Sequence, residues 1–271
     1  MPPVPLPDDL EEPLVVDESS PLMGNEKRGE FAARRHVFFS FMDASERPDG
    51  MPVYDTPWWR FWHAAAFCTG GILFLIGTLL YYPTMYLVNI QADETVDFML
   101  VLIGWLYTIG SCGFLFVDVQ EFFTFTDDPI LRFNIACSAF GSTLYVIGSA
   151  GFLPSIWVYT DLIGLYGFLG GSLAIGLSQT WKLYRILSTH TRPYKASTIN
   201  AALVEGGAMV GGYCFLVGTA MFYHGPVEGD VGCEVTCFNY NALMFLWSTG
   251  SSFFTLGGLS LAYRHAVMKL T

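Results

Sequence analysis

The sequence predicts an all-α integral membrane protein with six transmembrane helices. Of its 271 residues, 52% are hydrophobic and only 14% are charged. Together with a positive mean hydropathy, this composition favours a lipid bilayer over water as the surrounding solvent. Six apolar runs follow Pro57, and each is long enough, at about 1.5 Å per residue, to cross roughly 30 Å of hydrocarbon.

The elements divide into a tail and a transmembrane domain. Residues 1–57 are rich in Pro, Asp, Glu and Ser and contain no run long enough to insert, which predicts a disordered or extended tail without a cleavable signal peptide. Residues 58–271 form the predicted transmembrane domain. Lipid offers no hydrogen bonds to the backbone, so each apolar run should be a helix. The predicted spans are 60–83, 97–118, 133–154, 159–181, 199–223 and 240–263.

Basic residues sort to one side of these spans. All 13 Lys and Arg lie in the segments 1–59, 119–132, 182–198 and 264–271 or at the helix ends beside them. The loops on the other side hold only acidic charge. By the positive-inside rule, both termini are expected to face the cytoplasm.

An internal repeat is visible in the odd-numbered spans. The strings GGILFLIGTLLYYP, GSTLYVIGSAGFLP and GGYCFLVGTAMFYHGP share glycines seven residues apart and a proline near the outer end. The chain is therefore predicted to be three tandem helical hairpins, at about 60–123, 131–187 and 197–268. Small residues let helices approach closely in lipid, although they could instead clear room for a lipid tail, a pigment or a permeating solute. The predicted packing glycines are Gly70, Gly77, Gly141, Gly148, Gly211, Gly218, Gly110, Gly170 and Gly250.

The first hairpin resembles a known family. Its two strings, WWRFWHAAAFCTGGILFLIGTLLYYP and LIGWLYTIGSCGFLFVDVQEFF, are similar to the YrhK-like domain, a two-helix membrane unit. The likeness covers about 60–123 and extends less fully to the later hairpins. The resemblance implies a hairpin fold and carries no activity and no functional residues.

Glu205 is the candidate intramembrane carboxylate. It lies about six residues into the fifth span, in NAALVEGGAMVGG, where an ionised carboxylate costs several kcal/mol unless it is paired or protonated. It could pair with Arg185 or Lys195 near the cytoplasmic interface. Alternatively, it could bind a proton or a cation.

Asp118 and Glu121 are three residues apart and share one helix face at the cytoplasmic end of the second span. We expect them to anchor that helix end or to form interfacial ion pairs with Arg60 or Arg132 on neighbouring hairpins. The corresponding places in the other hairpins are Gln179 with Lys182 and Arg264 with His265, which favours ion pairs between hairpins over a repeated active site.

Cys233 and Cys237 lie in the predicted outer loop, where an oxidising compartment would permit a disulfide. A metal site with His224 is the alternative, but it offers only three ligands. Histidine also occurs as His63, which stands among aromatic residues at the start of the first span, where an aromatic belt is expected.

No catalytic motif or clustered basic face is present, so an enzyme and a nucleic-acid binder are both disfavoured. The sequence favours a non-enzymatic structural or accessory subunit of a membrane assembly. The alternative is a small-solute or ion channel or transporter, for protons or cations. Expected partners are membrane lipids and other subunits or further copies of the chain. No cofactor is predicted, although bound lipids are. The tail string ESSPLM is similar to acidic dileucine sorting signals, which favours a eukaryotic endomembrane or plasma membrane.

Overall fold

The structure is a computed structural model that describes residues 56–88, 94–125, 128–160, 162–189, 195–223 and 233–269. Within the helices, the side chains of 83–97 and 222–240 are not part of this description. The predicted tail lies outside the described residues as far as residue 55.

All regular structure in these ranges is helical. The helices are α2 (Pro57–Val88), α3 (Glu94–Thr124), α4 (Pro129–Gly151), the short α5 (Pro154–Trp157), α6 (Leu162–Thr189), α7 (Ala196–Tyr223), α8 (Cys233–Tyr263) and the π-helix η4 (Arg264–Met268). Most are longer than the predicted spans, because an apolar run marks only the part that crosses hydrocarbon while the helix continues beyond it. The turn of α5 was not predicted.

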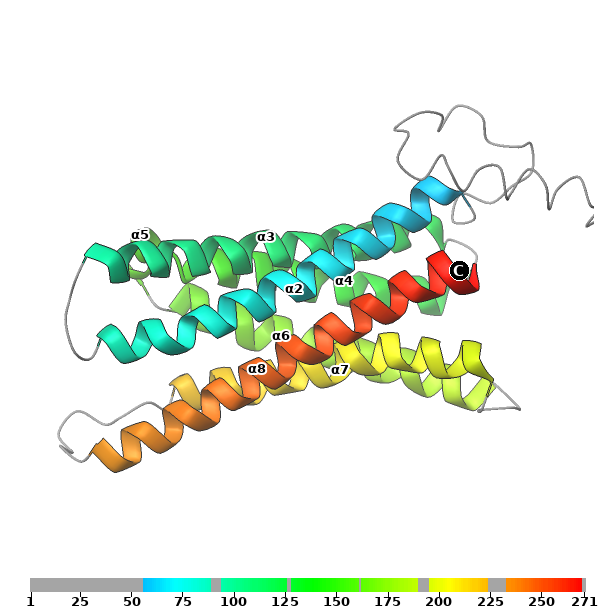
Figure 1. Cartoon of the computed structure of the whole chain (residues 1–271). Coiled ribbons are helices and arrows are strands. Elements are labelled where there is room, and N and C mark those ends of the chain that lie inside the picture. The colour runs from blue at the N-terminus through cyan, green and yellow to red at the C-terminus, as the bar shows by residue number, and fades with distance from the viewer. Residues whose placement is uncertain are drawn as a thin grey trace, which may run out of the picture. The chain divides into compact units, whose positions relative to one another are not determined.

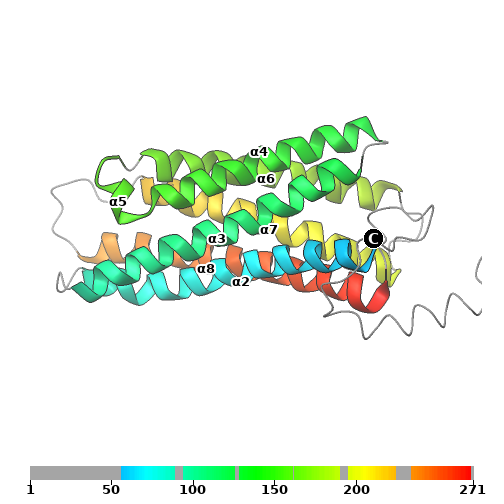
Figure 2. The same cartoon turned by 90° about the horizontal axis from the view of Figure 1, so that it is seen from above.

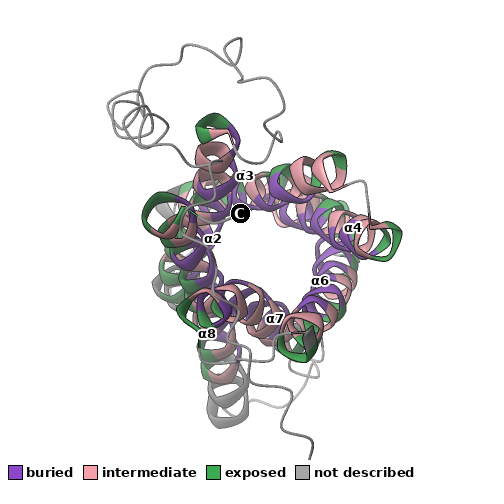
Figure 3. Cartoon of the chain, turned by 90° about the vertical axis from the view of Figure 1, so that its right-hand side faces the viewer, coloured by how far each residue is buried: buried purple, intermediate pink, exposed green. Residues whose placement is uncertain are grey.

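The six long helices form a closed ring. In chain order α2, α3, α4, α6, α7 and α8 each pack against the next, and α8 packs against α2 to close the circle. Figures 1 and 2 show the helices running side by side, and Figure 3 shows the ring from one end, with buried residues facing its centre. The ring consists of three hairpins, which are α2 with α3, α4 with α6, and α7 with α8.

The outer surface of the ring is apolar. Large hydrophobic side chains such as Leu79, Ile109, Phe140 and Leu177 point outward and are more than half exposed. In water this surface would be a severe aggregation hazard, whereas lipid tails cover it at no cost. Five helices, α2, α3, α4, α6 and α7, are long and apolar enough to cross a membrane. The chain is therefore described as a multi-pass membrane protein.

The sixth long helix is less apolar. The described part of α8 carries Asn241, Ser248, Ser251 and Ser252 among its apolar residues, and this helix is not among the five. It nevertheless packs between α7 and α2 along the same axis (Figure 1).

Corresponding residues of the three hairpins occupy corresponding places inside the ring. Phe74, Tyr145 and Phe215, from the first helix of each hairpin, all have no exposed surface. The same is true of three hydroxyl residues one turn further along these helices and of three serines in the second helices. These hydroxyl residues are Thr78, Ser149, Thr219, Ser111, Ser172 and Ser251.

Aromatic rings fill the middle of the ring of helices. The Phe74 ring lies with its centroid 5.0–6.3 Å from those of Tyr107, Phe114, Tyr145, Phe168, Phe215 and Phe254. Trp247 adds a further contact, 5.8 Å from Phe215. These eight residues are called the aromatic plug below. Hydroxyl groups bond around it, as in Thr78 to Tyr107 at 2.7 Å and Tyr145 to Ser172 at 2.8 Å.

Glycines allow the two helices of a hairpin to touch. A Cβ atom on Gly110, Gly171 or Gly250 would lie 2.8–3.1 Å from the carbonyl oxygen of a glycine on the facing helix. The prediction of Gly170 at this place was wrong by one residue. A Cβ on Gly170 would meet only the end of the Leu144 side chain, at 3.0 Å. Two adjacent glycines, at 170 and 171, leave the alignment of the repeat ambiguous in the sequence. The buried Ser172 shows that Gly171 corresponds to Gly110 and Gly250, because each of these glycines precedes a buried serine.

The other predicted glycines lie against the facing helix, tightly except for Gly77, whose added Cβ would meet the Tyr107 ring at an ordinary 3.5 Å. A Cβ on Gly70 would come within 2.9 Å of the Gly110 oxygen, and one on Gly148 within 2.7 Å of the Phe168 nitrogen. Gly141 and Gly211 face the partner helix in the same way, and Gly77 and Gly218 face the rings of Tyr107 and Trp247. Their predicted role in helix packing therefore agrees with the geometry.

The described basic residues gather at one end of the ring, called the basic end. Arg60 donates to the Lys269 carbonyl oxygen at 3.2 Å, Arg264 donates to the Ser197 carbonyl oxygen at 3.1 Å, and Arg185 lies 2.6 Å from Asp128. Both the start of α2 and the C-terminal η4 lie at this end (Figures 1 and 2). This agrees with the predicted sorting of charge, while the side of the membrane that this end faces stays a prediction.

Candidate functional site

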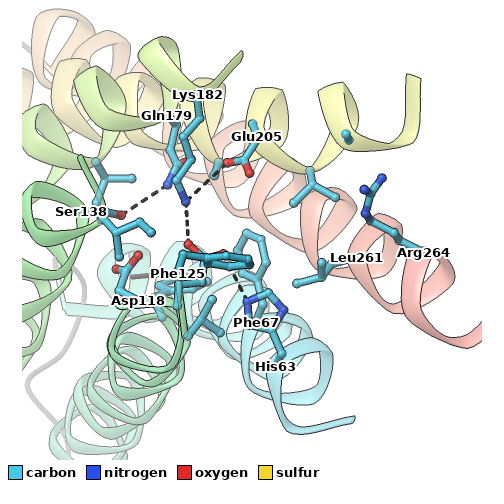
Figure 4. A pocket seen from close by; sticks show the side chains of 18 of the residues that line it. His63, Phe67, Asp118, Phe125, Ser138, Gln179, Lys182, Glu205, Leu261 and Arg264 are labelled. Atoms are coloured by element: carbon cyan, nitrogen blue, oxygen red, sulfur yellow. Dashed lines mark hydrogen bonds and ion pairs between the residues drawn. The ribbon is translucent and has the colours of Figure 1, made fainter. Parts of the chain in front are cut away.

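A cavity of about 590 Å³ lies inside the ring at the basic end, below the aromatic plug. Its inner wall is apolar and includes Phe67, Phe114 and Phe254. Nearer to the mouth, five of the six long helices and η4 contribute polar or charged side chains, whereas α8 contributes only Phe254 and Leu261. Figure 4 shows the side chains of Ser138, Gln179, Lys182 and Glu205 pointing toward one another. The polar and charged side chains of the lining are His63, Asp118, Glu121, Ser138, Ser142, Gln179, Lys182, Arg185, Ser197, Glu205, Arg264 and His265.

Lys182 of α6 stands at the centre of this polar group. Its ammonium nitrogen lies 2.8 Å from Glu121 Oε2 of α3 and 4.0 Å from Glu205 Oε2 of α7. The Lys182 side chain is 10% exposed, so the ion pair is almost removed from bulk solvent. One residue from each hairpin thus meets in the cavity, and breaking such a buried pair costs far more than breaking one at the surface.

Asp118 and Gln179 lie one helical turn nearer to the plug. Ser142 of α4 donates to Asp118 Oδ2 at 2.5 Å, and Gln179 donates through Nε2 to Ser138 Oγ at 3.3 Å. The Gln179 carbonyl oxygen is buried without a hydrogen-bond partner in the described structure. A buried orphan acceptor of this kind costs about 1–3 kcal/mol until a donor reaches it.

Two histidines extend the network to the mouth. His63 Nε2 lies 3.2 Å from Glu121 Oε1, and His63 Nδ1 lies 3.0 Å from His265 Nε2 of η4. Because a carboxylate only accepts, a neutral His63 donates through Nε2 to Glu121 and accepts at Nδ1 from His265. The Trp59 ring stacks on His63 with centroids 4.4 Å apart. Two hydrogen bonds in series, from His265 to His63 and from His63 to Glu121, therefore connect η4 to α2 and α3.

Arg264, the first residue of η4, lines the cavity directly after the end of α8. Burial lowers the pKa of this guanidinium, and the nearby Glu205 carboxylate opposes that shift. Arg264 contributes positive charge at the mouth of the cavity, and Glu205 lies further inside.

The structure places Glu205, the predicted intramembrane carboxylate, in the cavity wall. Its side chain is 20% exposed, and its cation neighbour is Lys182. Of the two predicted partners, Arg185 instead lies beside Asp128, and Lys195 is exposed before α7. The sequence singled out a carboxylate that lines the cavity, but it did not identify the cation beside it.

Glu121 forms an ion pair between hairpins, as expected, but with Lys182, whereas Asp118 accepts a hydrogen bond from Ser142. Glu121 binds Lys182 and His63, whereas Arg60 donates to the Lys269 carbonyl and Arg132 lies over the Phe122 ring at 4.6 Å. The prediction of Arg60 and Arg132 as partners was wrong. Asp118 and Glu121 face the inside of the ring, which these two arginines do not line.

Sequence reasoning missed Lys182, Gln179, His63 and His265 as members of one site. A signal for two of them was present: Asp118 and Gln179 each follow a buried serine, Ser111 or Ser172, by seven residues, and Glu121 and Lys182 follow it by ten. His63 was expected in an outward aromatic belt. Only part of that cluster faces outward, because Trp58 is 43% exposed whereas Trp59 and His63 are 5% and 4% exposed.

The cysteine predictions have separate outcomes. Cys68, Cys112, Cys137 and Cys214 are free thiols in the helices. The backbone at Cys233 and Cys237 belongs to α8, but their side chains lie outside the described residues, so the disulfide stays a prediction. Within the described ranges, no cluster of three His, Cys, Asp or Glu residues is suited to a metal ion.

Comparison of the chain with protein families, curated proteins and solved structures finds no match. The resemblance of the first hairpin to the YrhK-like domain therefore stays a prediction. The geometry of the cavity is therefore the basis for proposing the chain's function.

Proposed function

We propose that this chain is a six-span membrane carrier that takes up protons or a small cationic solute through the cavity at the basic end. The observation that carries the proposal is that Glu121 and Glu205 flank one buried ammonium, Lys182, while a third carboxylate, Asp118, lies in the same cavity. The two arginines of the lining, Arg185 and Arg264, already bind acceptors at its mouth. Excess negative charge in a low-dielectric interior is costly unless a proton or a cation neutralises it.

The aromatic plug favours a carrier over an open channel. Beyond the cavity, Phe74, Tyr145 and Phe215 have no exposed surface, and their rings are in contact. A solute that enters from the basic end therefore meets a closed wall. In a carrier cycle, this arrangement corresponds to the state that is open to one side only.

The proposed membrane arrangement places α8 as the sixth span and both termini in the cytoplasm. Three points support it: α8 completes the ring, corresponding buried residues recur in the three hairpins, and the described cations gather at one end. Three hairpins in the same orientation surround one central site, and internal repeats around a central site are common among transporters.

The first expectation from the sequence was a structural or accessory subunit. Four buried polar side chains, those of His63, Asp118, Gln179 and Lys182, are all less than 10% exposed and favour a binding site over a purely structural role. Association with other subunits, self-association and bound lipids stay predictions.

Transport in reconstituted liposomes tests the proposal. We expect proton or small-cation flux above that of protein-free vesicles, and we expect Glu205→Gln to reduce it strongly while preserving the shape of the side chain. Asp128→Asn is the matched control, because it also neutralises one carboxylate but lies at the helix end outside the cavity and still caps α4. Absence of flux, or equal flux in Glu205→Gln and wild type, would rule the proposal out.

A further inference from the structure

Two acceptors in the cavity, on Glu205 and Gln179, have no hydrogen bond to a donor in the described structure. Glu205 Oε2 lies 4.0 Å from Lys182 Nζ, which is beyond hydrogen-bond distance. Gln179 is 7% exposed, and its carbonyl oxygen has no hydrogen-bond partner in the described structure. Among the cavity-lining residues that the structure describes, Gln179 alone has a buried side-chain atom in this condition.

The cations around the cavity, in contrast, already bind acceptors. Lys182 donates to Glu121 at 2.8 Å, Arg185 lies 2.6 Å from Asp128, and Arg264 donates to the Ser197 carbonyl oxygen at 3.1 Å. An anionic ligand would have to displace one of these contacts and would lie close to Glu205. A ligand that brings its own N–H donors and positive charge would complete the site without breaking a contact.

The apolar wall adds a second requirement. Phe67 lines the cavity together with Phe114 and Phe254, which belong to the aromatic plug, and the three rings offer the cavity aromatic surface. A volume of about 590 Å³ is in the range of pockets that enclose whole organic molecules rather than single ions. Aromatic faces also attract organic cations.

We propose that the cavity binds a protonated organic amine with an apolar body. Its ammonium group donates to Glu205 and to the Gln179 carbonyl oxygen, and its body contacts the aromatic wall formed by Phe67, Phe114 and Phe254. The inference rests on the proposed function for the identity of the site, and it adds the class of solute and the residue, Gln179, that selects for an N–H donor.

A set of ligands with one shape and three charges tests this proposal on the full chain in lipid nanodiscs. Benzylammonium, benzyl alcohol and benzoate have similar size, and methylammonium has the charge without the body. By isothermal titration calorimetry, we expect benzylammonium to bind saturably with a Kd at least about tenfold lower than those of the other three, because only it meets both requirements. A Kd for benzoate or benzyl alcohol equal to that of benzylammonium would overturn the proposal.

Variants assign the contacts. Glu205→Gln should raise the Kd for benzylammonium at least about tenfold by removing the charge. Gln179→Met, which keeps the length but removes the acceptor, should raise it about fivefold. Asp128→Asn should leave it unchanged. Unchanged affinity in both cavity variants would overturn the assignment, and gel filtration of each variant separates this result from misfolding.

Failure of this inference can be told from failure of the carrier proposal. Saturable binding of benzylammonium without transport in liposomes would support the ligand class and remove the carrier. Proton flux that depends on Glu205, without binding of any amine, would support the carrier and overturn the ligand class.

Discussion

The same six helices form the level of the aromatic plug and the basic end of the ring, but the three hairpins are alike in the first region and differ in the second. At the level of the plug, the three hairpins are alike, with Phe74, Tyr145 and Phe215 in equivalent buried places. One to three turns nearer to the basic end, they differ. Counted from the buried serines, the second helices carry Asp118, Gln179 and Gly258 at one equivalent position, and Gly258 takes the place that was predicted for Arg264.

The position three residues further along the same helices differs in the same way, with Glu121, Lys182 and Leu261. Repeated hairpins pack against one another with the same geometry, so the same residues suit each interface inside the ring. A binding site instead needs different chemical groups to converge from different sides. The place where the repeat stops is therefore the place where we expect function.

The part of the ring at the level of the plug is called the symmetric half, and the part around the cavity is called the asymmetric half. The largest loss of stability is expected from a substitution in the asymmetric half, at Lys182. Lys182→Met removes the ammonium and leaves Glu121 and Glu205 as buried carboxylates, so we expect the free energy of unfolding to fall by about 3–5 kcal/mol. Unfolding in mixed micelles with increasing SDS measures this change.

A second substitution serves as the control for Lys182→Met. Adding Glu121→Gln in the same chain should recover part of the loss, because one unpaired charge disappears. If the double variant were no more stable than Lys182→Met, charge would not be the cause of the loss.

The symmetric half gives a matched pair of glycine substitutions with a smaller expected effect. Gly171→Ala places a Cβ 2.8 Å from the Gly141 carbonyl oxygen, a backbone atom that cannot rotate away, so we expect a loss of about 1–3 kcal/mol. Gly170→Ala meets only a Leu144 methyl group and should be neutral, or more stable by up to about 1 kcal/mol, because alanine favours helix.

The same unfolding assay compares the two glycine variants. Equal losses for both would contradict the register of the repeat given above. A larger loss at Gly170 than at Gly171 would restore the register predicted from the sequence.

The sequence predicted the symmetric half better than the asymmetric half, for a physical reason. Apolar runs, charge sorting and glycine spacing are local properties, and they predicted long apolar helices and a basic end. They could not predict which helix face points inward, because these helices are apolar on every side. His63 therefore looked like part of an outward belt, and Lys182 looked like one of the cations that set topology.

Glu205 was the exception among the site residues. A carboxylate well inside an apolar run is costly wherever it points, so no knowledge of helix orientation was needed to single it out. Its partner could be identified only from the ring, because Lys182 lies on another hairpin and 23 positions earlier in the chain.

The smallest effect is expected at Asp128, a carboxylate outside the cavity that forms a partly exposed ion pair with Arg185 at the cavity mouth. Asp128 Oδ1 accepts from the backbone N–H groups of Ile130 and Leu131, and its Oδ2 lies 2.6 Å from Arg185. The hydrogen bond from Leu131, with help from Arg185, holds the pKa of Asp128 below its usual value. Since exposed pairs contribute little, Asp128→Ala should lower the melting temperature far less than Lys182→Met does.

The pH dependence of that difference is a further check. Because the folded state depresses the pKa, the stabilisation by Asp128 is fully present above the pKa of the unfolded chain, about 4, and is lost as the pH falls through the lower folded value. The melting temperatures of wild type and Asp128→Ala should therefore converge as the pH falls below about 4. A gap that stays constant down to acid pH would show that the carboxylate charge contributes nothing, and that the inside and outside pairs differ in kind as well as in size.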